Sequence, residues 1–309
     1  MRIVFAGTPQ VAVPSLQAIA EAGHEIVAVV TRPDAAQGRG RKLTASPVAQ
    51  AAEQLGVPVL KPLKADAEFA AHLAQLRPDV CPVVAYGALL PQSVLDVPPH
   101  GWMNLHFSLL PRWRGAAPVQ RAIMAGDEIT GVTTFRLVRE LDAGPIWRTA
   151  ETPIQAGQTA GDLLRQLSIS GAQVLVDTLA DIEAGVQPTE QPAGDFEYAE
   201  KLTVEELEID WRLDAEQISD LILGASPTPG AWSSLADTRF KVLRALPATA
   251  PVELQPGALH ADRRHLWAGS GGHSGAVELI EVQPPGKKSM RGADWARGVT
   301  GGVDGVVLG

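Results

Sequence analysis

The chain has 309 residues, 45% of them hydrophobic and 20% charged, and a formal net charge of −9. This length fits two domains better than one, and no apolar run reaches the roughly 20 residues that a membrane-spanning helix needs. The acidic balance argues against a surface covered with nucleic-acid-binding charge, although local basic patches remain compatible with it. A single cysteine, Cys81, excludes an intrachain disulfide and is typical of a reducing compartment, so we expect a cytoplasmic globular protein.

The first 185 residues alternate short apolar runs with segments of helical period. The apolar runs predict strands at 2–7, 25–31, 57–62, 78–87, 101–108, 131–138 and 144–154. The helical periods predict helices at 9–23, 46–56, 67–76, 117–126 and 159–185, and residues 32–45 read as a loop. This alternation predicts a Rossmann-like α/β domain, with a mostly parallel sheet and helices on both faces.

The character of the sequence changes at residues 186–206, which are polar and contain prolines. Beyond them, a helix is predicted at 214–225, and short strands are predicted at 239–246, 257–269 and 276–283. Several short strands separated by Gly and Pro favour a small β-barrel of OB-like type. We therefore predict a first domain at 1–188, a linker at 189–206 and a smaller C-terminal domain at 207–309.

Polar side chains interrupt the apolar strand "GWMNLHFS". Side chains alternate along a strand, so Asn104, His106 and Ser108 share one face. They lie at the carboxyl end of a predicted parallel strand, where open α/β sheets bind ligands. Asp142 follows in a loop, "LVRELDAGPIW". An Asn that polarises a carbonyl, a His that moves protons and an Asp that orients the His would form a catalytic trio. The structural alternatives are a hydrogen-bonded core His and an ordinary Asp-x-Gly turn.

Several familiar catalytic and cofactor motifs are absent from the sequence. There is neither a Gly-x-Ser-x-Gly motif nor a cysteine in a reactive setting, so we expect direct group transfer without a covalent enzyme intermediate. There is no G-x-G-x-x-G, no Walker A sequence and no spacing typical of metal ligands. We therefore expect neither a dinucleotide nor a metal.

Two short segments concentrate positive charge. Residues 32–42 carry Arg32, Arg39, Arg41 and Lys42, and residues 286–297 carry Lys287, Lys288, Arg291 and Arg297. Such patches fit contacts with a phosphate backbone, and the alternative is a solvated loop or helix face.

Taken together, "FAGTP", "GRGRK", "VVAYG", "NLHFSLLPRWRGAAPVQRAI", "GVT" with "LDAGP", and "QPPGKK" resemble the methionyl-tRNA formyltransferase family over nearly the whole chain. The resemblance implies the formyltransferase fold and the transfer of a formyl group from 10-formyltetrahydrofolate to the amino group of methionyl initiator tRNA. It also implies a folate-binding catalytic domain at 1–188 and a C-terminal domain that contributes to tRNA binding. We expect a monomer without a membrane partner.

The same resemblance assigns roles to particular residues. Asn104, His106 and Asp142 match the family's catalytic trio. The family's folate-contacting loop is matched by Ser108, Leu109, Leu110 and Pro111. The basic residues expected to bind tRNA are Arg39, Arg41, Lys42, Lys287 and Lys288. The chain departs from many relatives at Phe107, where they have a small residue.

Two other functions remain open from the sequence. One is a formyltransferase or formyl hydrolase of the same fold that acts on a small molecule, such as a glycinamide nucleotide or an amino sugar. The other is a non-catalytic, Rossmann-like RNA-binding module. The extra C-terminal domain and the "GRGRK" loop favour tRNA over a small molecule, and the trio argues against a module without catalysis.

Overall fold

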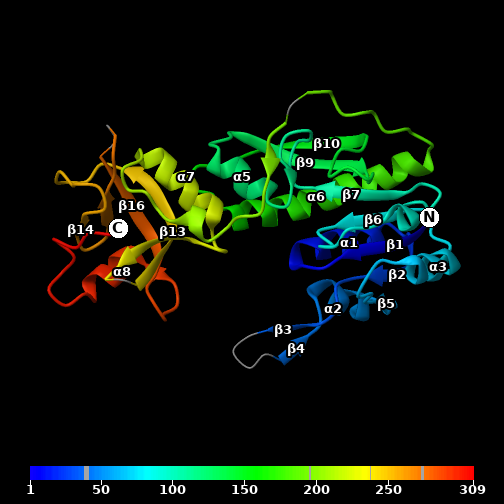
Figure 1. Cartoon of the computed structure of the whole chain (residues 1–309), viewed down its shortest axis with the longest axis horizontal. Coiled ribbons are helices and arrows are strands. Elements are labelled where there is room, and N and C mark those ends of the chain that lie inside the picture. The colour runs from blue at the N-terminus through cyan, green and yellow to red at the C-terminus, as the bar shows by residue number, and fades with distance from the viewer. Residues whose placement is uncertain (38–41, 195, 237, 273–274) are drawn as a thin grey trace. The chain divides into compact units, whose positions relative to one another are not determined.

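The computed structural model describes residues 1–37, 42–194, 196–236, 238–272 and 275–309 (Figure 1). The chain forms two compact units: the first comprises 1–115, 130–152 and 164–198, and the second comprises 116–129, 153–163 and 199–309. Two earlier segments, 116–129 and 153–163, therefore pack with the C-terminal part. The predicted domains, 1–188 and 207–309, are each one continuous stretch of chain, whereas each of these units combines several segments. The predicted division stays a prediction.

A seven-stranded sheet in the order β10-β9-β7-β6-β1-β2-β5 forms the centre of the first unit. Its strands are β1 (Arg2–Gly7), β2 (Glu25–Val30), β5 (Val59–Leu60), β6 (Cys81–Val84), β7 (Trp102–His106), β9 (Ile129–Arg136) and β10 (Ile146–Pro153). From β5 to β7 each neighbouring pair is parallel, whereas β9 runs antiparallel to β7. The mostly parallel sheet predicted from the continuous apolar runs is thus confirmed.

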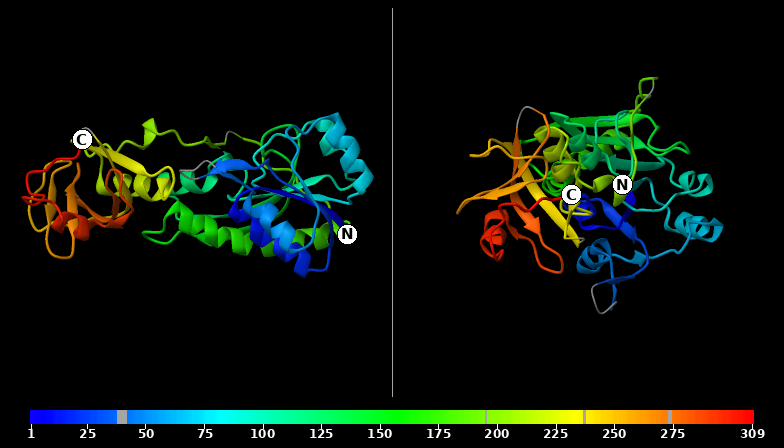
Figure 2. Two further views of the ribbon diagram at one scale, coloured as in Figure 1. Left: turned by 90° about the horizontal axis from the view of Figure 1, so that it is seen from below. Right: turned by 60° about the vertical axis from the view of Figure 1, so that its left-hand side comes forward.

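Helices cover both faces of this sheet (Figures 1 and 2). They are α1 (Val13–Glu21), α2 (Pro47–Gln54), α3 (Ala67–Leu76), α4 (Gln92–Leu95) and α6 (Ala160–Glu183). On one face, Phe69 of α3 and Val94 of α4 join a core cluster with Trp102 of β7. On the other face, α6 approaches β7 closely at Gly171, where an added Cβ would lie 3.1 Å from Leu105. Since Asn104 and His106 alternate with Leu105, they lie on the face away from α6.

The sequence beside a helix start explains where α2 begins but not where α1 begins. Ser46 caps α2, because its hydroxyl accepts a hydrogen bond from the Ala49 amide at 3.0 Å. The helix predicted at 9–23 begins only at Val13, after a 3₁₀ turn at Gln10–Ala12. Thr8 does not cap it, since its hydroxyl donates to the carbonyl of Tyr86 at 2.8 Å.

Two short strand pairs lie outside the main sheet. β3 (Ala35–Gln37) pairs with β4 (Lys42–Thr44), within the segment that was predicted as a loop. Arg39 and Arg41 lie outside the described residues, and of Lys42 only the backbone is described. β8 (Arg114–Gly115) pairs with β11 (Tyr198–Ala199). The second pair joins the segment after His106 to the predicted linker.

The second unit is built on six antiparallel strands. In sequence they are β12 (Ala231–Leu235), β13 (Thr238–Ala248), β14 (Leu259–Ala261), β15 (Leu266–Gly269), β16 (Ala276–Gln283) and β17 (Met290–Arg291). The helices are α5 (Pro118–Met124), α7 (Ala215–Ala225) and α8 (Gly292–Arg297), with a 3₁₀ turn at Glu205–Leu207. The predicted small β domain is confirmed: in the described ranges its strands pair in the order β12-β13-β16-β15-β14, and β17 pairs with β16. None of the described helices is long and apolar enough to span a membrane.

Asp220 on α7 makes stability depend on pH. Burial and the nearby Glu216 carboxylate raise the pKa of Asp220 to about 6 in the folded protein. In the unfolded chain the carboxyl has the ordinary pKa of about 4, so it loses its proton at a lower pH there. The free energy of unfolding should therefore fall as pH rises from about 4 to about 6. Asp220→Asn should stabilise the protein by about 1 kcal/mol at pH 7.5, a value reduced from the full shift because the carboxyl is only half buried. At pH 4 it should have little effect.

Urea denaturation of both proteins at the two pH values measures this difference. Glu253→Gln, which removes the same charge from an exposed loop, is the control and should show no such pH dependence. Equal stabilisation by Asp220→Asn at pH 4 and pH 7.5 would contradict the explanation.

Candidate active site

His106 ends β7, with a side chain that is only 6% exposed. Its Nε2 lies 2.8 Å from the carbonyl oxygen of Trp113. Because a carbonyl can only accept, Nε2 carries the proton of this hydrogen bond. The ring is thereby fixed in orientation, and Nδ1 remains for other partners. It faces the Asp142 carboxylate, whose Oδ2 lies 3.8 Å away.

Asp142 lies in the loop between β9 and β10, as predicted, with a buried side chain. Its backbone is left-handed, with φ of 49°, a conformation that is uncommon outside glycine. Oδ2 accepts a hydrogen bond from the Gly115 amide at 2.8 Å. The amide and the nearby imidazole thus compensate a buried carboxylate. At 3.8 Å the Asp142 carboxylate lies close to Nδ1 of His106 but too far away for a hydrogen bond.

Asn104 lies two residues before His106 on the same face of β7 and is half buried. Among the described residues, no hydrogen bond of its side chain is found. Its amide therefore offers donors and an acceptor to a ligand. The structure thus brings together the three residues predicted as a trio: two from one strand face and one from the loop beside it.

The predicted folate-contacting segment follows β7 as a tightly bonded turn. The Ser108 hydroxyl donates to the carbonyl of Arg112 at 2.8 Å. The Thr133 hydroxyl donates to the Ser108 carbonyl at 2.7 Å and accepts from the Leu110 amide at 3.1 Å. Leu110 is buried, whereas Leu109 and Pro111 are half buried. The Ser108 hydroxyl is thus engaged within the protein, and Leu109 and Pro111 present the more accessible surface.

Sequence reasoning missed several residues that hold this arrangement: Trp113, Gly115, Thr133 and Gln191. The first two lie only a few residues beyond His106, within the motif "LPRWRGAAP", so their place in the chain was a signal. Thr133 pairs with His106 across β7 and β9, which the predicted neighbouring strands could have indicated. For Gln191, in the polar stretch taken as a linker, the sequence carries no such signal.

Lys287 and Lys288 lie elsewhere, in the second unit. Both are exposed, in the turn between β16 and β17. Arg297, counted in the same basic segment, is paired with Asp294 at 2.5 Å and donates to the carbonyl of Arg263. The exposed lysines are therefore the stronger candidates for contact with phosphate.

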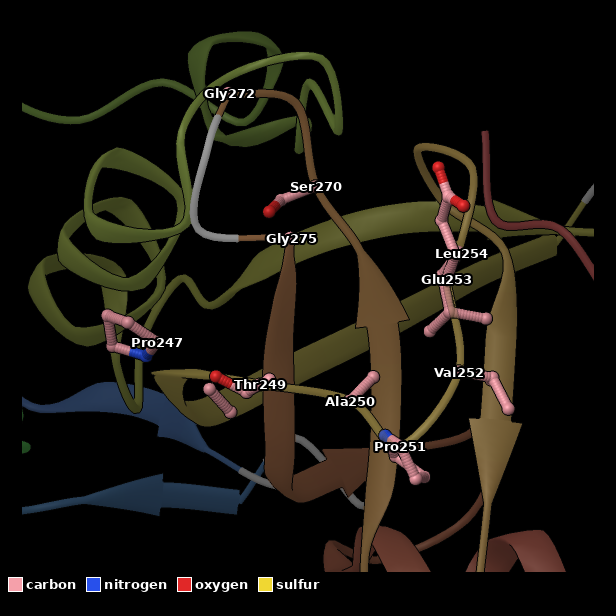
Figure 3. Close-up of a pocket in the computed structure, with 11 residues that line it drawn as sticks. Pro247, Thr249, Ala250, Pro251, Val252, Glu253, Leu254, Ser270, Gly272 and Gly275 are labelled. Atoms are coloured by element: carbon pink, nitrogen blue, oxygen red, sulfur yellow. The ribbon is translucent and has the colours of Figure 1, made fainter.

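The second unit also contains an open pocket of about 970 Å³, lined by residues 247–254 with Ser270, Gly272 and Gly275 (Figure 3). Among the described residues that line it, Glu253 is the ionisable one. It contains none of the predicted site residues. Within the described ranges, no three His, Cys, Asp or Glu side chains gather in a way that could hold a metal ion.

Comparisons with known proteins identify the family of this chain. Residues 1–179 match the formyl transferase family, and residues 201–300 match the formyl transferase C-terminal domain. A methionyl-tRNA formyltransferase from Streptomyces avermitilis is 52% identical over 302 residues, which is 97% of both chains. The chain belongs to the methionyl-tRNA formyltransferase family. The resemblance inferred from the motifs is therefore confirmed.

Solved structures of other formyltransferase-fold proteins share the fold of this family member. An N-formyltransferase from Helicobacter canadensis, in complex with folinic acid and dTDP-3-aminofucose, superposes with a TM-score of 0.69 at 17% identity, over 90% of this chain and 98% of that one. HypX from Aquifex aeolicus in complex with tetrahydrofolic acid gives a TM-score of 0.65 at 20% identity. That match covers 96% of this chain and 46% of HypX, so this chain spans about half of HypX.

Proposed function

We propose that this chain transfers the formyl group of 10-formyltetrahydrofolate to the free amino group of methionyl initiator tRNA. The observation that carries the proposal is the meeting of Asn104, His106 and Asp142 at the carboxyl end of β7 in a chain about half identical to methionyl-tRNA formyltransferases. The cytoplasm, where translation takes place, is the proposed location. That the enzyme acts as a monomer and without a metal stays a prediction.

The reaction forms a C–N bond between the formyl carbon and the methionyl amine and breaks the C–N bond to the folate nitrogen. The methionyl amine attacks the formyl carbon, and the carbonyl oxygen becomes a tetrahedral oxyanion. The Asn104 amide and a protonated His106 would stabilise this oxyanion by donating hydrogen bonds. The bond to the folate nitrogen then breaks, this nitrogen gains a proton and the attacking nitrogen loses one. One proton is lost and one is gained, so the two substrates and His106 supply every proton that the step needs.

The geometry indicates which imidazole nitrogen would take part. Nε2 is engaged with the Trp113 carbonyl, so the proton that moves would be carried by Nδ1. The Asp142 carboxylate, 3.8 Å from Nδ1, would stabilise the positive charge that the ring carries while it holds the transferred proton. On the donor side, the folate would lie against the turn at Ser108–Pro111, where Leu109 and Pro111 provide apolar surface.

A formylation assay tests the proposal. The full-length protein is incubated with 10-formyltetrahydrofolate and methionyl initiator tRNA, and formylmethionine is measured after the tRNA ester is hydrolysed. Elongator methionyl-tRNA is the control, and a glycinamide ribonucleotide and an amino-sugar nucleotide are the alternative acceptors. We expect product with initiator tRNA and much less with the other acceptors. Product from a small amine alone would overturn the tRNA assignment, and tRNA binding without product from any acceptor would overturn the enzyme assignment.

Lys287 and Lys288 are proposed to contact the tRNA backbone, together with the basic loop at Arg39, Arg41 and Lys42. Replacing both lysines of the β16–β17 turn by alanine should weaken tRNA binding. It should also make the slope of log affinity against log salt shallower by about 0.7 to 0.9 for each phosphate that the variant no longer neutralises. The single-turnover rate on saturating tRNA should not change, because the turn carries no residue of the trio.

The measurement is tRNA affinity across a salt series. Lys64→Ala, which removes one positive charge from an exposed loop of the first unit, is the matched control and should leave the slope unchanged. An unchanged slope for the double variant would remove this turn from the binding surface.

A further inference from the structure

The polar stretch predicted as a linker is bonded to the loops that hold the trio. Its described residues 189–194 and 196–198 are called the strap. Thr189 and Ile146 exchange backbone hydrogen bonds of 2.7 and 2.8 Å beyond the Asp142 loop. The Glu197 carbonyl accepts from the Trp113 amide at 3.0 Å. Trp113 in turn holds His106, so the strap contacts both halves of the site.

Gln191 is the point of the strap that contacts both loops. Its Nε2 donates to the backbone carbonyls of Asp142 and Gly144, each at 2.8 Å. Its Oε1 accepts from the Arg114 guanidinium, from Nε at 3.2 Å and from Nη2 at 2.5 Å. A primary amide has two N–H donors and two acceptor lone pairs, so all of its hydrogen-bonding positions are used. The half-buried Gln191 thus joins the Asp142 loop to the residue before Gly115.

The partners determine which way round the amide lies. Backbone carbonyls only accept and a guanidinium only donates, so the nitrogen must face Asp142 and Gly144 and the oxygen must face Arg114. Glutamate has the same length and would keep the contact with Arg114. It would, however, place an oxygen against two carbonyl oxygens, where it can only repel. The site therefore requires an amide in this position.

Asp142 needs such support because its peptide has a left-handed backbone, which an unrestrained loop would leave. The Gln191 amide holds that peptide and the one two residues later. The carboxylate is thereby kept on the Gly115 amide and beside Nδ1 of His106. We propose that Gln191 is a positioning residue of the formyl-transfer site: it acts through Asp142, without touching substrate. This inference rests on the proposed function.

The test compares Gln191→Glu with the wild-type protein in single-turnover formylation of methionyl-tRNA. We expect the rate to fall roughly 10- to 100-fold, the effect of displacing a reacting group slightly, while the KM for the folate donor and the melting temperature change little. Gln187→Glu is the matched control in the same polar stretch, since the carbonyl of Gly185 is the one hydrogen-bond partner that its side chain has among the described residues. It should retain the wild-type rate. A wild-type rate for Gln191→Glu would overturn the proposal.

A double-mutant cycle separates positioning from a general structural role. In an Asp142→Asn background, Gln191→Glu should lower the rate by less than about threefold, because residues that act as a unit are not additive. An equal loss in both backgrounds would show that Gln191 does not act through Asp142. Gln191→Met, which keeps the side-chain length and removes all four hydrogen bonds, replaces Gln191→Glu in both backgrounds if the latter unfolds.

A readout without substrate distinguishes failure of this inference from failure of the proposed function. Backbone amides of residues 137–144 should exchange hydrogen about tenfold faster or more in Gln191→Glu than in Gln187→Glu. If the wild-type protein forms no formylmethionyl-tRNA but exchange accelerates, the function is wrong and the positioning role stands. If exchange is unchanged in that loop, the positioning role is wrong whatever the activity.

Discussion

Replacing His106 by alanine should lower the turnover of formyl transfer by about a thousandfold or more. The substitution removes a proton carrier, an effect of roughly 10²- to 10⁴-fold, and at the same time a donor to the oxyanion. Asn104→Ala should lower turnover by roughly 10²- to 10³-fold, the effect of losing one such donor. Asp142→Ala should also lower turnover strongly, because the imidazole then lacks its neighbouring charge. The measurement is single-turnover formylation with both substrates saturating.

The fold and the affinity for tRNA should survive these three changes, as circular dichroism and binding titrations would show. His100→Ala is the control, since His100 is exposed and lies ahead of β7. It should turn over at the wild-type rate. If any one of the three variants keeps nearly wild-type turnover, that residue has no part in the chemistry.

Gly144→Ala should destabilise the protein by about 3 kcal/mol and abolish most turnover. An added Cβ would lie 1.8 Å from the carbonyl oxygen of Arg136. This is a backbone atom, so no side-chain rotation can relieve the clash. Arg136 is itself held, since its amide donates to the Pro145 carbonyl at 2.9 Å and its backbone pairs with Met103 of β7. The Asp142 loop must therefore move as a whole, a severe form of overpacking.

Chemical denaturation and the formylation assay measure the two effects of Gly144→Ala. Gly298→Ala is the control, because the atom nearest to its added Cβ is 3.4 Å away and its φ of −85° suits any residue. It should change stability by less than about 1 kcal/mol. A stable Gly144→Ala variant with normal turnover would show that the loop tolerates a different path.

The parts of this molecule that were predictable are those set by local pattern. Apolar runs of strand length placed the central strands, and α3 covers the residues that its helical period predicts. The shared face of Asn104 and His106 follows from alternation along one strand. Strand β12 and helix α8 were not predicted, because a short, mixed run such as "AWSSL" gains its structure by pairing with β13.

The support of the site could not be read from the sequence because it depends on partners far apart in the chain. Gln191 contacts residues 47 and 49 positions away on one side and 77 on the other. Nothing in a polar, proline-containing stretch distinguishes a glutamine with four hydrogen bonds from one in solvent. The left-handed backbone of Asp142 likewise could not be predicted, because it depends on the path that the loop takes through Gly144 and Pro145.

The strap limits where two members of this family could be joined into a chimera. A crossover at residue 186, where the polar stretch begins, would combine the strap of one parent with the Asp142 loop of the other. A crossover just after Ala199 keeps that pair matched. Neither junction keeps α5 and α7 from the same parent, although α7 packs against α5 so closely at Gly224 that an added Cβ would lie 2.4 Å from Met124. Exchange of the part after Ala199 therefore requires residues 116–129 to be transplanted with it.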